Sequence, residues 1–270
     1  MVMKIRILFA LLISLIMISC KKDKPIVDSP KKTGNIHFQF SHKVNGQILI
    51  TDTLVYTNTA GNHYMVNDIK YFISEITLHN SNGSNYVISS ANGIHYIDTD
   101  IPSTYLWQPI DNVPAGNYTS VSFIFGINQE KNIAGLFTNP PEVNMAWPQP
   151  LGGGFHYMQL NGWWMDTNAM LSPLSFHLGI GQIYSHDVIV LDSITGFVQN
   201  YFTVNLPSSA LTITANATTN AEITMNIDSW FDTPNVYNFD YWGGSIMQNQ
   251  TAMRTIVENG ADVFTFQLNP

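Results

Sequence analysis

The chain contains eight histidines, and imidazole is the side chain that most often binds transition metals in proteins. Two of them, His42 and His177, lie among apolar residues in segments that resemble strands, as in Phe176-His177-Leu178. Such an imidazole is either a metal ligand or a buried neutral histidine that hydrogen-bonds the backbone, and the sequence leaves both interpretations open. The eight are His37, His42, His63, His79, His95, His156, His177 and His186.

Methionines and tryptophans gather in the middle of the chain, around one of these histidines. Thioether sulfur favours Cu(I), whereas Met and Trp in a β-rich core more often serve as packing residues. The cluster therefore adds candidate copper ligands without requiring a copper site. Its members are Met145, Trp147, His156, Met158, Trp163, Trp164, Met165 and Met170.

The only cysteine in the sequence is Cys20, near the N-terminus. If its thiol is lipidated, the folded part of the protein has no thiol. Disulfide frameworks, Cys-ligated zinc, iron–sulfur clusters, cysteine nucleophiles and blue-copper sites are then excluded together. Any metal site must be built from His, Met, Asp, Glu or backbone groups.

Motifs of the common enzyme classes are missing. The sequence has no Gly-x-Ser-x-Gly elbow, no His-Glu-x-x-His, no Walker loop and no protein-kinase signatures. Asp98-Thr99-Asp100 begins like a calcium loop, but Ile101-Pro102 follows where further ligands should come. We therefore expect a protein that is not an enzyme. A pair of carboxylates that meet in space, as in a glycosidase, is a distant alternative.

Charge excludes nucleic acids as partners. Residues 33–270 carry four Lys and Arg against 17 Asp and Glu, a formal charge of −13. Four scattered cations cannot form the basic face that neutralises several phosphates.

The N-terminus is typical of a bacterial lipoprotein signal. Lys4 and Arg6 precede the apolar run 7–18, which is too short for a stable membrane span. Met17-Ile18-Ser19-Cys20 resembles a lipobox and predicts cleavage before Cys20 and lipidation of its thiol. We expect a signal peptide over 1–19, a lipidated cysteine and Lys/Pro-rich tether over 20–34, and one domain over 35–270. This places the protein outside the cytoplasm, anchored by lipid to a membrane, most simply the outer membrane with a periplasmic or surface-exposed domain.

Period-two patterns predict the elements that must position the candidate ligands. In the stretch 36–42 the apolar residues Ile36, Phe38 and Phe40 share one face, and His42 falls on the same face. We expect further strands over 121–127, 155–160, 211–214 and 223–227. A helix capped by Ser245 and closed by Gly260 is predicted near the C-terminus, and a shorter helix over 129–137. The fold class is all-β: a sandwich of mostly antiparallel strands with one C-terminal peripheral helix.

The order of short motifs from residue 36 onward resembles the MbnP-like family, which is named for copper proteins found with methanobactin gene clusters. The motifs include Phe40-Ser41-His42-Lys43-Val44-Asn45-Gly46, Ile94-His95-Tyr96-Ile97-Asp98, Met145-Ala146-Trp147, Leu160-Asn161-Gly162 and Phe176-His177-Leu178-Gly179.

This resemblance implies a β-rich extracytoplasmic protein that binds copper. It assigns His42, His95 and His177 as metal ligands, because His is usual at these positions in the family. It also makes Trp147 the candidate for oxidation, since some members carry a Trp converted to kynurenine by a partner dihaem enzyme related to cytochrome c peroxidases. We expect three neutral imidazoles to converge on one copper ion, with a carboxylate such as Asp98 orienting one of them. The protein would store, deliver or sense the metal.

A second interpretation remains open. The chain could be a non-catalytic surface lipoprotein that binds glycans or proteins through exposed aromatic residues. Trp107, Trp163, Trp164 and Trp242 would then form a stacking surface. Convergent histidines favour copper binding, and an exposed aromatic groove favours the second interpretation.

Overall fold

Alternating burial along the first strand shows how this sequence builds a sandwich. In β1 (Thr33–Val44), Ile36, Phe38 and Phe40 are buried, and the residues between them are partly exposed. Successive side chains of a strand point to opposite faces. The apolar side chains of an alternating strand therefore all pack against the core.

The structure is a computed structural model that describes residues 32–269. The expected signal peptide, Cys20 and all but the last residues of the tether lie outside the described residues. Regular structure begins at Thr33, two residues before the domain start expected at 35. In the described part of the chain, none of the helices is long and apolar enough to cross a membrane.

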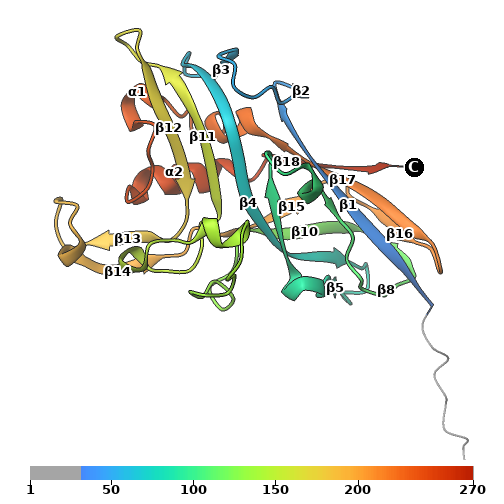
Figure 1. The fold of residues 1–270 in the computed structure, drawn as a ribbon. Coiled ribbons are helices and arrows are strands. Elements are labelled where there is room, and N and C mark those ends of the chain that lie inside the picture. Colours follow the sequence, from blue (N-terminus) through green and yellow to red (C-terminus); the bar gives the residue numbers. More distant parts are fainter. Residues whose placement is uncertain (1–31, 270) are drawn as a thin grey trace, which may run out of the picture. The chain divides into compact units, whose positions relative to one another are not determined.

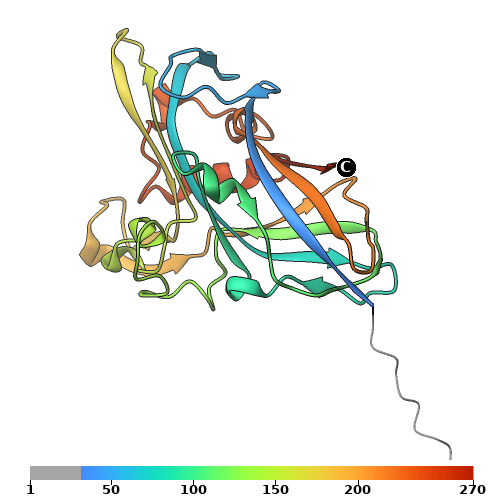
Figure 2. The same ribbon diagram turned by 45° about the vertical axis from the view of Figure 1, so that its right-hand side comes forward.

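One sheet has six strands and is built around β1. The order is β18-β17-β1-β2, and two short strands, β7 and β8, also pair with β1. The β1–β17 pairing is parallel, whereas the other strand pairs of this sheet are antiparallel. These two strands lie side by side in both views (Figures 1 and 2). The bounds are β2 (Gln47–Ile48), β7 (Leu106–Trp107), β8 (Val113–Pro114), β17 (Thr218–Asn226) and β18 (Phe264–Asn269).

The other main sheet has eight strands and is built around β4 (His63–His79), which is 17 residues long. The order is β12-β11-β4-β10-β15, and β3, β5 and β6 also pair with β4. All of these pairings are antiparallel. The bounds are β3 (Tyr56–Thr57), β5 (Tyr86–Val87), β6 (Ile94–Asp98), β10 (Ser120–Phe125), β11 (Met158–Met165), β12 (Leu171–Leu178) and β15 (Phe202–Leu206).

The remaining strands of the described residues form two two-stranded antiparallel ribbons. One pairs β13 (Gly181–Tyr184) with β14 (Ile194–Val198), and the other pairs β9 (Gly116–Tyr118) with β16 (Leu211–Ile213). The β13–β14 ribbon projects at the left of Figure 1.

The eight-stranded sheet buries residues on both of its faces. Its inner face packs against the six-stranded sheet in the large core, to which Tyr71 and Phe176 contribute. Its outer face carries a smaller core, where Phe72 and Tyr96 pack with Met145 and Phe155. The segment between β10 and β11 therefore covers part of the outer face.

Within residues 32–269, both α-helices lie near the C-terminus: α1 (Phe239–Trp242) and α2 (Gln250–Asn259). The predicted helix starts later than expected because Ser245 forms a β-bridge with Ser175. Asn249 caps α2 instead, since its side chain accepts the N–H of Ala252 at 3.0 Å.

The short helix predicted over 129–137 was wrong. That stretch consists of turns, and Gly135 has a φ of +82°, which a helix does not accommodate. The strand predicted over 155–160 begins only at Met158. The fold class is confirmed: a mostly antiparallel β-sandwich with a small helical part.

Candidate metal centre

His42 lies between the two sheets, where β1 faces β4. It is 5% exposed, and its Nε2 is 3.1 Å from the Tyr71 hydroxyl. Its ring also packs on Tyr105, with ring centroids 5.3 Å apart. Burial lowers the pKa of His42 to about 4, so the imidazole is neutral at pH 7.

His95 also points into the space between the sheets, from the edge strand β6. Its ring stacks on Trp107 at 5.0 Å and on Phe40 at 5.3 Å. Its Nε2–H donates to the Thr104 carbonyl at 2.7 Å. The pKa of His95 is lowered to about 4 by burial, against the opposing effect of this hydrogen bond.

His177 lies on the other face of the eight-stranded sheet. Its neighbours Phe176 and Leu178 are fully buried in the large core, so the side chain between them points outward. The structure therefore separates His177 from His42 and His95 by the sheet itself. Among the described residues, no group of three or more His, Cys, Asp or Glu is arranged to hold a metal ion. The expected convergence of these three histidines on one ion does not occur.

The structure instead brings His177 together with His156 and Trp147. The His156 and His177 rings are 5.3 Å apart and nearly perpendicular, at 87°. The Trp147 indole meets the His156 ring edge-on at 4.6 Å. Two imidazoles and one indole thus form a contiguous group, which we call the outer-face cluster.

A tight loop positions Trp147 and His156. Ala146 and Phe155 form a β-bridge, and the Trp147 N–H donates to the Gly154 carbonyl at 2.8 Å. On the same loop, the backbone N–H of His156 donates to the Met145 carbonyl at 2.7 Å. This pairing folds the segment back on itself over the sheet and explains why β11 begins only after His156.

Each imidazole of the outer-face cluster uses one ring nitrogen in a hydrogen bond. His156 Nδ1–H donates to the Met145 carbonyl at 2.9 Å, and His177 Nε2 is 2.8 Å from Oδ1 of Asn161. The other two nitrogens, His156 Nε2 and His177 Nδ1, form no hydrogen bond within residues 32–269. They are the atoms available to a metal.

Both imidazoles are neutral at pH 7. Burial lowers the pKa of His156 to about 4, and proximity to His177 lowers it further against the hydrogen bond to Met145. Burial likewise lowers the pKa of His177 to about 4, with Asp68 opposing the shift. Neutral imidazole is the form that binds metals.

Trp147 is buried and is fixed by contacts on two sides of its indole. It is 3% exposed, and its Nε1–H donates to the Leu151 carbonyl at 2.9 Å. Gly179 lies against the other side: a Cβ there would be 2.5 Å from the indole. The missing side chain at Gly179 therefore makes room for Trp147.

Comparison with known proteins identifies the family of the chain. The family model described as MbnP matches residues 33–249. The chain belongs to the MbnP family. Among solved structures, MbnP from Methylosinus trichosporium aligns with a TM-score of 0.52 and 9% identity, over 88% of this chain and 100% of that one. No curated protein sequence matches the chain significantly.

Two of the four site residues expected for this MbnP-family chain, His177 and Trp147, lie in the outer-face cluster. His156 was counted among the histidines but was not selected as a ligand. The only sequence signal for His156 is its position within the Met/Trp cluster, close to the loop that begins at Met145. Cys20, the expected lipidation site, lies outside the described residues.

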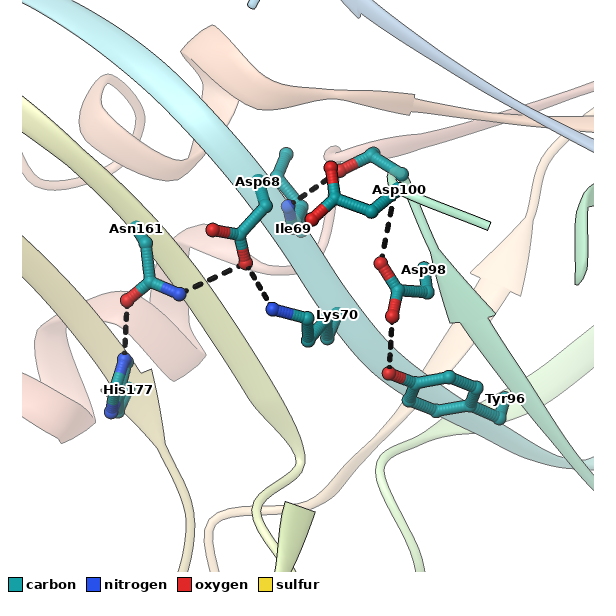
Figure 3. A network of polar contacts seen from close by, with 9 residues as sticks. Asp68, Ile69, Lys70, Tyr96, Asp98, Asp100, Asn161 and His177 are labelled. Carbon is teal, nitrogen blue, oxygen red and sulfur yellow. Dashed lines mark hydrogen bonds and ion pairs between the residues drawn. The ribbon is translucent and has the colours of Figure 1, made fainter. Parts of the chain in front are cut away.

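The orienting carboxylate also differs from expectation. Asp98 does not contact an imidazole; it accepts the Tyr96 hydroxyl at 2.7 Å and the Asp100 N–H at 2.9 Å. Asp68 fills that role from β4, through Asn161 (Figure 3).

The aromatic surface of the second interpretation does not form. Trp107 and Trp164 are buried, and Trp242 is partly buried. Trp163 is the exposed member of the four, at 39%. This leaves no stacking surface made by these tryptophans.

Proposed function

We propose that this MbnP-family chain is a lipid-anchored extracytoplasmic copper-binding protein that stores, delivers or senses the metal without catalysing a reaction. His156 and His177 would hold the copper ion beside Trp147. The observation that carries the proposal is the pair of neutral imidazoles whose ring centroids lie 5.3 Å apart, each with one nitrogen that forms no hydrogen bond within residues 32–269.

The ligand set favours Cu(I) over the other metals that imidazole binds. Structural Zn²⁺ takes four ligands and catalytic Zn²⁺ takes three from the protein, whereas this cluster offers two imidazoles and no carboxylate or thiolate in contact with them. Cu(I) is stable with few neutral ligands. The buried indole beside His156 also limits access of water to the ion.

We further propose that a dihaem partner related to cytochrome c peroxidases oxidises Trp147. Because this residue is 3% exposed, the partner would have to withdraw electrons through the protein rather than by direct contact with the ring. The copper ion and the oxidised ring would then be neighbours.

The location rests on the sequence. The lipobox ending at Cys20 supports a lipid anchor, and the charge of −13 over residues 33–270 supports attraction of cations toward the domain.

Anaerobic Cu(I) titration of the full-length protein in detergent tests the proposal. We expect one Cu(I) per chain for the wild type and loss of binding for the double variant His156→Ala/His177→Ala. The matched control, His42→Ala/His95→Ala, removes two equally buried imidazoles and should retain the ion if it folds. Absence of copper from the folded wild type, or retention by the first variant, would refute the site. Mass spectrometry of the Trp147 peptide tests the oxidation.

A further inference from the structure

We infer that Asn161, held by Asp68, is a positioning residue that selects Nδ1 of His177 as the metal ligand. This inference rests on the proposed function for its copper-binding consequence. The positioning itself is a property of the metal-free protein.

The network crosses three strands on the outer face of the sheet. Asp68 on β4 pairs with Asn161 on β11, and His177 on β12 lies diagonally beyond it (Figure 3). Asn161 Nδ2 is 2.9 Å from Asp68 Oδ1, and Asn161 Oδ1 is 2.8 Å from His177 Nε2. Paired residues of neighbouring strands point to the same face of a sheet, so all three side chains lie on the outer face.

The chemistry of these groups allows only one arrangement of protons. A carboxylate can only accept hydrogen bonds, so the amide of Asn161 must turn its NH₂ group toward Asp68. The carbonyl oxygen of the same amide then faces His177 and can only accept. His177 Nε2 must therefore carry the proton. In the neutral ring this leaves the lone pair on Nδ1.

An ion pair with Lys70 fixes the position of the Asp68 carboxylate. Its ammonium is 2.6 Å from the same Asp68 oxygen that accepts from Asn161. The Asp68 and Lys70 side chains are only 17% and 23% exposed, so water competes weakly for this ion pair. Charge-assisted hydrogen bonds of this kind are stronger than neutral ones, which makes the amide orientation hard to reverse.

Selection of the nitrogen decides whether the two imidazoles can share an ion. Asn161 covers Nε2 of His177. If the lone pair were on Nε2, the other nitrogen, Nδ1, would carry the proton and could not bind the ion. Second-shell partners of metal-bound histidines act in this way, and losing them typically weakens metal binding about 10- to 100-fold.

Nitrogen-15 NMR of histidine-labelled full-length protein in detergent tests the inference in two stages. In the metal-free wild type, we expect His177 to show one tautomer, with the proton on Nε2. On anaerobic addition of Cu(I), the Nδ1 resonance of His177 should move and Nε2 should keep its proton. A proton on Nδ1 in the metal-free protein, or copper on Nε2, would overturn the inference.

Three variants separate positioning from general damage. Asn161→Leu removes the acceptor, and Asp68→Ala removes the anchor of the amide without touching His177. Both should populate the tautomer with the proton on Nδ1 and weaken Cu(I) binding about 10- to 100-fold. Asp98→Asn alters a neighbouring buried carboxylate that does not contact Asn161, and it should change neither readout. Unchanged tautomer and affinity in the first two variants would refute the role of the network.

The two proposals fail in different ways. If the wild type has the proton on Nε2 but binds no copper, the proposed function fails and the positioning stands. If copper binds to His156 and His177 while the Asn161→Leu and Asp68→Ala proteins behave like the wild type, the function stands and the positioning fails.

Discussion

Mild acid should destabilise the metal-free protein, because four histidines are buried in the neutral form. His42, His95, His156 and His177 each have a pKa of about 4 in the fold against 6.5 for an unperturbed side chain. Below pH 6.5 the unfolded chain takes up protons that the folded chain does not. The free energy of unfolding therefore falls as the pH drops from 6.5 toward 4, and these groups add no further loss below that.

The size of the effect follows from the same values. When the pH falls from 7.5 to 5.5, each histidine whose pKa is lowered from 6.5 to about 4 by folding reduces the free energy of unfolding by about 1 to 1.5 kcal/mol. The four together reduce it by about 5 kcal/mol. Whole domains of this kind are stable by about 5 to 15 kcal/mol. The loss is therefore large enough to bring the protein near its unfolding transition.

Urea unfolding followed by tryptophan fluorescence, at both pH values and with copper chelators present, measures this difference. His95→Gln should reduce it by about one quarter. His63→Gln serves as the control because His63 is exposed, and it should leave the difference intact. A wild-type difference below about 1 kcal/mol would show that these imidazoles are not held neutral by burial.

Four further substitutions test individual parts of the structure. Gly179→Ala places a methyl group 2.5 Å from the Trp147 ring and should cost about 1 to 3 kcal/mol in thermal or urea unfolding while weakening Cu(I) binding; wild-type values for both would contradict the packing described. Asn259→Ala removes a fully buried amide whose Nδ2 donates to the carbonyls of Trp230 and Asn235, and it should lower stability by about 2 to 3 kcal/mol, with no loss arguing against those bonds. Asn249→Ala removes the cap of α2 and should cost about 1 kcal/mol, whereas Ser245→Ala should show no capping loss. The reverse order of these last two effects would restore Ser245 as the helix start.

The sequence by itself determined the fold class and the family. Alternation at Ile36, Phe38 and Phe40 commits that stretch to a half-buried strand, because only a period of two puts all three on one face. The order of short motifs along the chain indicated the MbnP family. It singled out His42, His95, His177 and Trp147, of which only the last two lie in the outer-face cluster. Local signals placed Gly260 at the end of α2 but misplaced its start, because Ser245 is taken up by pairing with Ser175, 70 positions away.

Only the tertiary structure decided which residues meet. His95 and His177 look alike in sequence, each an imidazole in an apolar strand, yet the register of their strands sends one inward and the other outward. A shift of one residue reverses a side chain's face, and register depends on partner strands distant in the chain. His156 reaches His177 only because the loop that begins at Met145 folds back over the sheet. The site is thus set by long-range pairing, which no local pattern encodes.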